Sequence, residues 1–523
     1  MNDAKAFTKN PWAAMSVLVL GLFMTLLDLT IVNIAIPRIV DGLHASLDQV
    51  LWVLNAYSLL YAVLLITAAR LGDVFGPRRM FAAGVAIFTV ASAASGLAQD
   101  PTQLIIARGA QGLGAAVLAP QSLPIMLRLF PADRRGGVFA VYGVIAGLAV
   151  VAGPTLGGLL VTNFGWRWIF YVNIPVGILT FVLALAVLPR YRTGLRHRFD
   201  LVGVLLVTAG LLGLVFGLIE GQRYDWGAVT GGVTIPEIIG AGVAVLAAFF
   251  VHQALRQDRE PLLPFKVFKD RNFSLMTVVM AGMGFAILGA FLPLTIYLQS
   301  VLGLSAIQAG LTIAPQPVAM MIASSIAAPL SQKMNGKYLL IPGLVMFAAG
   351  LGYIDWTVQA GADRWALLPG LIVSGLGLGC IWLPLFSLAT RDLQPELAGV
   401  ASGVMNTIQE LGTVVASAAV GALLQNQLAT DLHSQAVTYS AQLPPAARDG
   451  FVAGFSHAVG RGLEVGVSQA GSGLGLAVFT HAFVDAMRIS MLLPIAVIVV
   501  AAIVTFGVRA GRAQATEAGR EAA

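Results

Sequence analysis

The stretch "LLDLTIVNIAIPRI", residues 26–39, places one carboxylate, Asp28, inside a run of apolar and small residues. The run begins at Met15 and continues to Pro37, with Asn33 as its only amide, and it is long enough to cross a bilayer as one helix. An Asp at the centre of such a helix costs roughly 2.5–3.5 kcal/mol on insertion scales. A charge kept at that cost is expected to have a partner or a function.

The composition of the chain indicates that a bilayer is present. Of the 523 residues, 58% are hydrophobic and only 11% are charged, whereas soluble domains carry about 25% charged residues. The 58 glycines are typical of helices that pack closely in membranes. The single Cys380 excludes an intrachain disulfide, and the six scattered His residues have no metal-ligand spacing. The sequence predicts an integral membrane protein.

The hydrophobic pattern predicts fourteen membrane-spanning helices. We place them at about 14–36, 49–69, 80–98, 102–127, 138–161, 169–189, 201–220, 236–255, 273–298, 307–331, 339–359, 366–389, 398–425 and 482–508. With both termini in the cytoplasm, most of the 31 Lys and Arg residues lie on the inner side. This distribution explains the pI of about 9.5, so nucleic-acid binding need not be invoked.

One connection is much longer than the others. Residues 426–481 are rich in Gly, Ser and Ala and contain Pro444 and Pro445. We expect this stretch to form an external loop, a hairpin with some helix in it.

The loop "ARLGDVFGPRRM", residues 69–80, has the residues of a gate between two helices. Asp73 can cap a neighbouring helix, Gly76 permits a tight turn, and Arg78 and Arg79 suit the inner headgroup layer. The alternative is that these are ordinary charges on the inner side of the membrane.

The fourth predicted helix, "LIIARGAQGLGAAVLAP" at 104–120, carries Arg108 inside the membrane and Gln111 one turn later. A fixed charge among small residues indicates a packed polar face in the protein interior. The alternative is that Arg108 extends to the outer interface.

The fifth predicted helix, "GVIAGLAVVAGPTLGGLL" at 143–160, contains Gly153, Pro154, Gly157 and Gly158. These residues predict a weakened and kinked helix. Close packing against a neighbouring helix is the alternative.

These motifs occur on the helices where the major facilitator superfamily has its own, and "GDVFGPRR", "RGAQGLG" and "GPTLGG" resemble its signature loop, fourth-helix motif and antiporter motif. The segments "LLDLTIVNIAIP", "WRWIFYVNIPVGI" (166–178), "FLPLTIYLQSVLGLSAIQAGL" (291–311) and "GVASGVMNTIQELG" (399–412) resemble the fourteen-helix drug:proton antiporters of the EmrB/QacA type. The resemblance implies an all-α major-facilitator fold. It consists of a six-helix half at 1–190, two inserted helices at 191–272 and a second six-helix half at 273–523.

Asp28 and Arg108 are predicted to lie at equal depth. Asp28 lies nine residues inside Pro37 and Arg108 seven inside Pro101, so both are roughly 10–14 Å from the outer end at 1.5 Å per residue. Pairing would lower the cost of both charges. Asp28 is then either a structural counter-ion or a titrating group, and the resemblance favours titration.

Glu410 is the second acid expected inside the membrane, close to the midplane of the thirteenth helix. No basic residue of that helix neutralises it, so a proton or a cationic substrate can compete for it. The alternative is a protonated, hydrogen-bonded structural residue. Five further acids near helix ends are expected to be solvated: Glu220, Asp225, Glu237, Asp355 and Asp485.

The resemblance implies a proton-coupled antiporter that exports amphipathic drugs or antibiotics, cationic ones included, from the plasma (inner) membrane. Asp28, Arg108 and Glu410 would couple protons, and Asn33, Gln111 and Glu410 would bind substrate. The expected partners are the substrate, protons and lipid, with the proton gradient in place of a cofactor and no enzymatic activity. A proton-coupled transporter of an endogenous metabolite or nutrient with the same fold is the alternative, against which "GPTLGG" argues.

Overall fold

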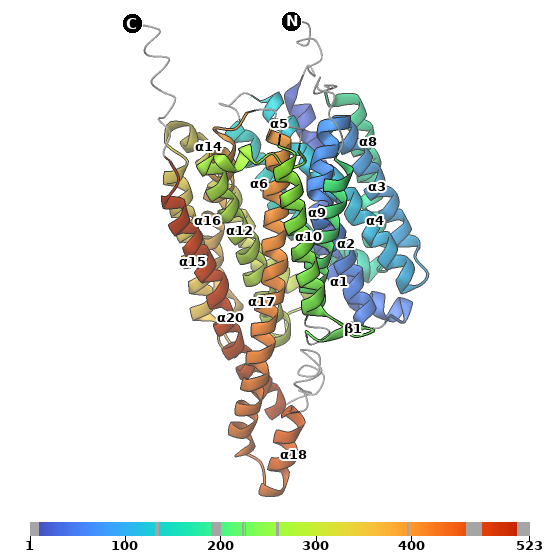
Figure 1. Ribbon diagram of the computed structural model, residues 1–523. Coiled ribbons are helices and arrows are strands. Elements are labelled where there is room, and N and C mark those ends of the chain that lie inside the picture. The colour runs from blue at the N-terminus through green and yellow to red at the C-terminus, as the bar shows by residue number, and fades with distance from the viewer. Residues whose placement is uncertain are drawn as a thin grey trace, which may run out of the picture.

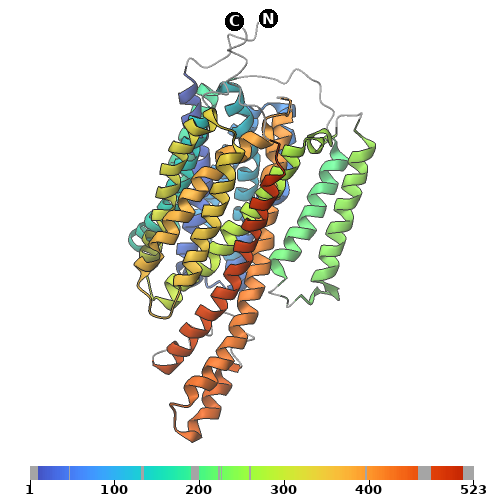
Figure 2. The same cartoon turned by 90° about the vertical axis from the view of Figure 1, so that its left-hand side faces the viewer.

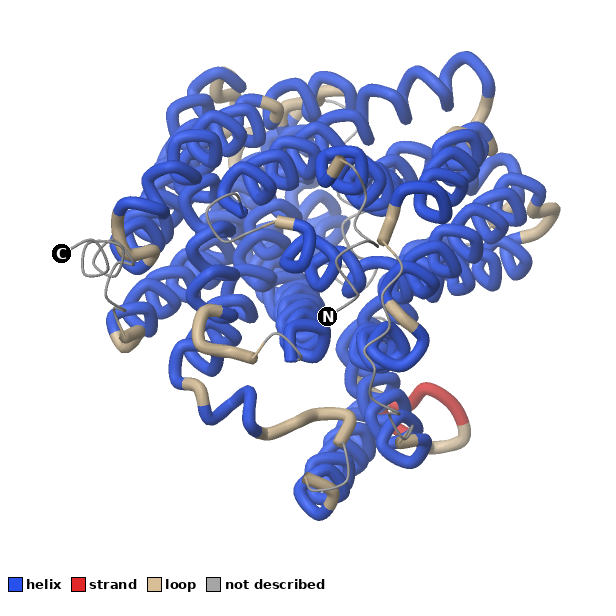
Figure 3. Tube along the Cα trace, turned by 90° about the horizontal axis from the view of Figure 1, so that it is seen from above, coloured by secondary structure: helices blue, strands red, loops and turns tan. Residues whose placement is uncertain are grey.

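The structure, a computed structural model, is a bundle of long helices that run side by side (Figure 1). It describes residues 10–45, 47–130, 135–189, 200–221, 224, 226–257, 261–394, 397–456 and 473–509. In the view from above, helices fill the bundle and a two-stranded antiparallel sheet lies at its edge (Figure 3).

Nearly all the elements are α-helices, apart from the strands, the 3-10 helices η2 and η4, and the π-helix η3. In chain order they are α1 (Pro11–Leu43), α2 (Leu47–Phe75), α3 (Pro77–Leu97), α4 (Pro101–Leu118), η2 (Ala119–Gln121), α5 (Ser122–Leu129), α6 (Arg135–Phe164), α7 (Trp168–Tyr171), α8 (Asn173–Val187), α9 (Leu201–Glu220), β1 (Ala228–Thr230), β2 (Val233–Thr234), α10 (Ile235–Leu255), α11 (Lys266–Lys269), α12 (Arg271–Ile296), η3 (Tyr297–Val301), α13 (Ala306–Ile313), α14 (Pro315–Lys333), α15 (Lys337–Thr357), η4 (Arg364–Leu367), α16 (Leu368–Thr390), α17 (Ala398–Ser440), α18 (Pro445–Ser456) and α20 (Leu474–Phe506).

Side chains define where several helices begin. The carboxamide oxygen of Asn10 accepts a hydrogen bond from the backbone N–H of Trp12 at 3.0 Å, at the start of α1. Asp270 accepts one from the N–H of Phe273 at 2.7 Å, at the start of α12. Such caps satisfy backbone donors that have no partner within the helix. They therefore stabilise the first turns of α1 and α12.

Twelve helices in the described part of the chain are long and apolar enough to cross a membrane. They coincide with twelve of the predicted spans. The other two predicted spans correspond to α4, η2 and α5 taken together and to α6. The chain is thus a multi-pass helical membrane protein, and the count of fourteen spans remains a prediction.

Proline interrupts two of the predicted spans. The helix predicted at 102–127 ends as α4 and resumes as α5 after η2, which contains Pro120. The helix predicted at 307–331 divides into α13 and α14, and Pro315 is the first residue of α14. Proline lacks the backbone N–H that a continuous helix needs, which accounts for both breaks.

The helices pack in two groups, with a pair of helices beside them. In the first group α1 packs on α6, and α3 packs on α4 and α8. In the second, α12 packs on α17 and α20, and α16 packs on α14 and α15. The groups meet where α6 contacts α14 and α2 contacts α17. The pair α9 and α10 stands at the edge of the bundle (Figure 2).

Glycines allow α4 to approach its neighbours closely. A Cβ atom built on Gly114 would lie 2.5 Å from the backbone N of Phe88 in α3. One built on Gly112 would lie 2.3 Å from the backbone O of Tyr57 in α2. Larger side chains would force the helices apart at these positions. The helix that carries Arg108 is therefore held tightly between α2 and α3.

The stretch 426–481, expected to be an external loop, is largely helical where the structure describes it. α17 has 43 residues, which makes it roughly 65 Å long at 1.5 Å per residue, about twice a bilayer core. It continues past the predicted end at 425, and α20 begins at Leu474 rather than at 482. With α18 they form a projection at the end of the bundle opposite the start of α1 (Figure 1). Residues 457–472 lie outside the described residues.

Candidate functional site

Asp28 in α1 and Arg108 in α4 form an ion pair inside the bundle. The Nη1 group of Arg108 donates a hydrogen bond to Oδ2 of Asp28 at 2.5 Å. Asp28 is 0% exposed and Arg108 is 1% exposed. The pairing expected from their equal depth is therefore present, and Arg108 does not extend to the outer interface.

Three further side chains complete the Asp28 network, which we define as Asp28, Ser92, Arg108, Gln111 and Asn173. The amide Nε2 of Gln111 donates to Oδ1 of Asp28 at 2.7 Å, and its Oε1 accepts from Nη1 of Arg108 at 2.8 Å. Nδ2 of Asn173 lies 3.1 Å both from Oδ1 of Asp28 and from Oγ of Ser92. The network joins α1, α3, α4 and α8 through one carboxylate.

The guanidinium group of Arg108 has partners besides Asp28. Its Nε donates to the backbone O of Val53 at 3.2 Å. Its Cζ lies 4.5 Å from the ring centroid of Tyr57 and 6.0 Å from that of Phe170. An aromatic face attracts a cation, and more strongly where water is excluded. Arg108 is thus held on several sides.

The burial of the network determines how much stability is lost when one of its charges is removed. Each of its five side chains is at most 1% exposed, so the two charges depend on each other and on the amides for stabilisation. Removing one partner of a buried ion pair costs about 3–5 kcal/mol, because the other charge remains without compensation. A change of charge at Asp28 therefore acts on four helices at once.

Glu410 in α17 has different surroundings. It is partly exposed, and within the described ranges its carboxyl group has neither a hydrogen bond nor an ion pair. Two turns before it on α17, a Cβ atom on Gly403 would lie 2.6 Å from Cβ of Ala69 in α2, so this face of α17 packs against α2. Glu410 thus lies on the face of α17 where the second group of helices meets the first.

The backbone on either side of Glu410 is held tightly by α12. A Cβ atom on Gly284 would lie 2.1 Å from the carbonyl O of Gln409, and one on Gly412 would lie 2.2 Å from that of Ala281. These close approaches fix α17 against α12 at this level. The position of Glu410 is therefore set by backbone packing, although its carboxyl group has no partner.

The predicted gate lies where α2 turns into α3. Gly76 has φ 94°, a conformation that glycine adopts without strain, and it directly precedes α3. Arg78 donates to the backbone O of Leu185 in α8, and Arg79 is exposed. Asp73 is in the last turn of α2, and its side chain lies outside what the structure describes.

The predicted antiporter motif, residues 153–158, lies where α6 packs on α1, against a part of α1 close to Asp28 in sequence. A Cβ atom on Gly153 would lie 2.0 Å from Oγ1 of Thr30, so this contact requires glycine. Gly157 and Gly158 are also buried, and α6 continues as one helix through the motif. The side chains of Pro154 and of Asn33 lie outside the described part of the chain.

The acids expected to be solvated behave differently from one another. Glu220 is only 2% exposed, so the prediction for it is wrong. It is the last residue of α9, and the packing of α9 against α2 buries it. Asp355 is half-buried, and its Oδ1 has no partner among the described residues. Glu237 and Asp485 are exposed as expected, and Asp225 lies outside the described residues.

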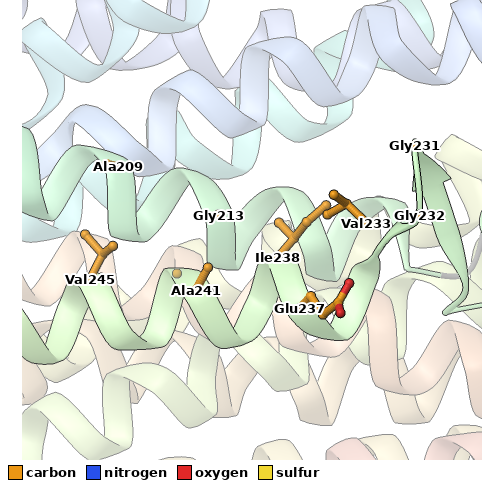
Figure 4. A pocket seen from close by; sticks show the side chains of 10 residues that line it. Ala209, Gly213, Gly231, Gly232, Val233, Glu237, Ile238, Ala241 and Val245 are labelled. Carbon is orange, nitrogen blue, oxygen red and sulfur yellow. The ribbon is translucent and has the colours of Figure 1, made fainter.

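A shallow groove lies between α9 and α10, and neither Asp28 nor Glu410 lines it (Figure 4). Small and apolar residues line it together with Glu237. The carboxylate of Glu237 is already engaged, because its Oε2 accepts from the backbone N and the hydroxyl of Thr234 at 2.7 and 2.9 Å. Its only acid is therefore a helix cap, which makes the groove a poor site for a cation.

Sequence reasoning missed two members of the network, Ser92 and Asn173, and the neighbouring Tyr57. Asn173 lies within the segment "WRWIFYVNIPVGI", so an amide inside an apolar motif was an available signal. Ser92 gives no such signal, because serine is common in packed membrane helices. The role of Tyr57 depends on the approach of α4 to α2, which the sequence does not state.

Comparison with known proteins gives a consistent result. The family model described as Major Facilitator Superfamily matches residues 18–417. The puromycin resistance protein pur8 of Streptomyces alboniger is 35% identical, with 86% of this chain and 88% of that protein covered. The tetracenomycin C resistance and export protein of Streptomyces glaucescens is 32% identical, with 81% and 78% covered.

Two further comparisons extend this result. An uncharacterized MFS-type transporter of Mycobacterium tuberculosis is 37% identical, with 87% of this chain and 79% of that protein covered. Among solved structures, the human organic anion transporter MFSD10 has a TM-score of 0.57 at 13% identity, and 94% of this chain and 99% of that chain are covered. At that identity the likeness concerns the fold alone.

Proposed function

The chain belongs to the Major Facilitator Superfamily, and from this membership we propose that it exports amphipathic drugs or antibiotics, cationic ones included, in exchange for protons. The observation that carries the proposal is the buried Asp28 network, a charge-bearing site that joins four helices of a transporter. The relatives named for puromycin resistance and for export of tetracenomycin C support export as the direction of transport.

Asp28 is the proposed proton site. When its carboxylate takes up a proton, the ion pair with Arg108 is lost, and the amide donors of Gln111 and Asn173 face a neutral group. Because these donors come from α4 and α8, the preferred packing of α1 against both helices changes with protonation. This links proton binding to a rearrangement of the first group of helices.

Glu410 is the proposed site of contact with a cationic substrate. Its carboxyl group is partly exposed and has no partner in the described part of the chain, so a cation can approach it without displacing a protein group. A proton and a cationic substrate would compete for this carboxylate, which supports an exchange of one for the other. Asn33 in α1 is proposed to contribute a polar contact to substrate. Both amide atoms of Gln111 are engaged in the Asp28 network, so Gln111 would contact substrate only after protonation of Asp28 releases them.

The loop at 69–80 is proposed to gate the inner side through Asp73, Gly76, Arg78 and Arg79. Asp73→Asn removes a charge and keeps the size of the side chain, so it should leave the amount of membrane protein unchanged and slow turnover. Normal turnover at normal expression would make these residues ordinary interfacial charges.

We further propose that the protein resides in the plasma membrane, with both termini cytoplasmic and the projection of α17, α18 and α20 outside. Single cysteines at Thr193 and at the exposed Asp449, in a Cys380→Ala background, should then label from opposite sides with an impermeant maleimide. Labelling from the same side would overturn this orientation.

The function is tested by reconstituting the purified protein in liposomes with a pH dye inside and an imposed proton gradient. Ethidium and puromycin should move against their gradients as protons move in the opposite direction. Movement of substrate and protons in the same direction would instead favour the alternative, a proton-coupled importer. Transport that ignores the proton gradient would rule out antiport.

A further inference from the structure

Tyr57 in α2 is fully buried, at 0% exposure, and its hydroxyl group has no hydrogen-bond partner in the structure as described. Such a hydroxyl destabilises a fold, because it has lost its hydrogen bonds to water without replacement. Phenylalanine would fill the same space without this loss. The oxygen atom of Tyr57 therefore needs an explanation other than fold stability.

The ring of Tyr57 is fixed against the Asp28 network. Its centroid lies 4.5 Å from Cζ of Arg108. Its backbone O is the atom that a Cβ on Gly112 would approach to 2.3 Å, and the backbone O of Val53, one turn earlier, accepts from Nε of Arg108 at 3.2 Å. The ring and the guanidinium group are thus held together by the packing of α2 on α4.

The hydroxyl group of Tyr57 is within electrostatic reach of carboxyl groups from both groups of helices. The charged and titratable residues that act on it are Asp28 in α1, Tyr61 in α2, Arg108 in α4 and Glu410 in α17. α2 packs both on α4 and on α17, so it is the helix that connects the two acids. On α2, Tyr57 is a side chain whose hydroxyl group is subject to both charges.

We propose that the hydroxyl group of Tyr57 forms a hydrogen bond with the Glu410 carboxyl group during the transport cycle and thereby couples it to the Asp28 network. The inference rests on the proposed function, proton-coupled export. When Asp28 is neutral, Arg108 loses its anionic partner and keeps the ring of Tyr57 as a main contact. A shift of the guanidinium group then moves the ring, and with it the distance of the hydroxyl group from Glu410. Tyr57 is accordingly a positioning residue.

The test compares Tyr57→Phe with Tyr61→Phe in proteoliposomes that report ethidium movement and proton movement together. Tyr61 is a matched control: it lies one turn later on α2 and stacks on Tyr57, with ring centroids 6.1 Å apart and an interplanar angle of 16°. Tyr57→Phe should unfold at the same or a higher temperature, because it removes an unpartnered oxygen. Its proton-coupled exchange should fall about tenfold, the usual effect of one lost hydrogen bond. Tyr61→Phe should retain exchange.

A double-mutant cycle with Glu410→Gln shows whether the two residues act together. If they do, Tyr57→Phe added to Glu410→Gln should cause little further loss of exchange. Additive losses, normal exchange in Tyr57→Phe or a Tyr57→Phe protein that does not fold would each overturn the proposal. If the proposed function itself were wrong, the wild-type protein in the same assay would move ethidium without moving protons.

Discussion

Two acids inside this helical bundle, Asp28 in α1 and Glu410 in α17, have opposite surroundings. Asp28 is 0% exposed and accepts hydrogen bonds from Arg108, Gln111 and Asn173. Glu410 is partly exposed, and its carboxyl group has no hydrogen-bond partner where the structure is described. One acid is part of a completed network, and the other is positioned by its backbone alone.

Because their surroundings differ, the two acids suit different functions in transport. A carboxylate held by several donors cannot change its charge without changing those contacts, so it suits conversion of proton binding into helix movement. A carboxylate without partners can bind and release a cation without such rearrangement. The first group of helices would then respond to protons, and the second would receive substrate.

The largest effect is expected from breaking the ion pair. Asp28→Asn leaves Arg108 buried and charged without its anion, which should cost about 3–5 kcal/mol of stability and abolish transport. Arg108→Gln should reduce folded protein less, because Asp28 can become neutral by taking a proton whereas arginine stays charged. Thermal unfolding in detergent and exchange in proteoliposomes measure the two effects.

The double change Asp28→Asn with Arg108→Gln separates structure from mechanism. It removes both charges and should restore folding without restoring proton-coupled exchange. Restored exchange would show that the pair is purely structural. Asp28 would then not be the proton site that the comparison with Glu410 assigns to it. Asp485→Asn is the control, since this acid is exposed and its loss should alter neither property.

The next largest effect is expected at Glu410. Glu410→Gln mimics the protonated acid and breaks no described contact, so the protein should fold normally. Export of cationic ethidium should fall at least tenfold, and export of a neutral substrate much less, because only a cation gains from a carboxylate. Vesicle assays with both substrates measure the ratio. Equal losses would instead indicate proton coupling at Glu410.

The sequence allowed prediction of the two acids but not of their surroundings. Asp28 and Arg108 stand out because charges are rare in apolar runs, and equal depth led to their pairing. Asn173 joins them only through the packing of α8 on α1. That contact is a property of the tertiary structure, so no local pattern in the sequence predicts it.

The projection is a second case in which packing outweighed composition. The Gly and Ser content of 426–481 argued for a loop, yet α17 extends into it and contacts both α18 and α20, and Phe455 of α18 is buried. Weak helix propensity is readily overridden by such contacts. The twelve apolar helices, in contrast, follow directly from hydrophobic length.

A smaller effect should follow from removing one donor of the network. Asn173→Ala takes one hydrogen bond from Asp28 and the amide partner from Ser92, while Arg108 and Gln111 keep their contacts. The expected loss is about 1–2 kcal/mol of stability and a partial loss of exchange. Thermal unfolding and initial exchange rates check this.

Asn163→Ala is the matched control for that change, because Asn163 is an exposed amide at the end of α6. It should leave both stability and exchange near wild type. If Asn173→Ala behaved like this control, the functional network would consist of Asp28, Arg108 and Gln111 alone. Protonation of Asp28 would then act on the two helices α1 and α4 rather than on four.

The smallest effect on transport is expected from a third acid that has partners but lies outside the two groups of helices. Asp200 caps α9, where its carboxylate accepts a hydrogen bond from the backbone N–H of Gly203 at 3.0 Å, and it is 2% exposed. The carboxylate also accepts from the side chains of Gln253 at 2.8 Å and Arg256 at 3.2 Å. Nε2 of His252 lies 3.0 Å from it. Burial by itself raises the pKa of Asp200, but the hydrogen bonds from His252, Gly203 and Gln253 outweigh it and hold the pKa below its ordinary value.

A lowered carboxyl pKa contributes stability at every pH above the unfolded value of about 3.9, and this contribution is lost only as the pH falls through the lower folded value. Asp200→Asn keeps an oxygen that can cap α9 but removes the charge that accepts from His252 and Arg256. It should therefore cost about 1–2 kcal/mol at neutral pH, and the difference from wild type should shrink only in strong acid. Exchange per folded molecule should stay unchanged, since α9 and α10 carry none of the proposed coupling residues. Thermal unfolding from pH 3 to pH 8, with exchange normalised to folded protein, measures both. A loss of exchange as large as that of Asn173→Ala would mean that a completed hydrogen-bond network does not by itself distinguish the proton site from a structural clamp.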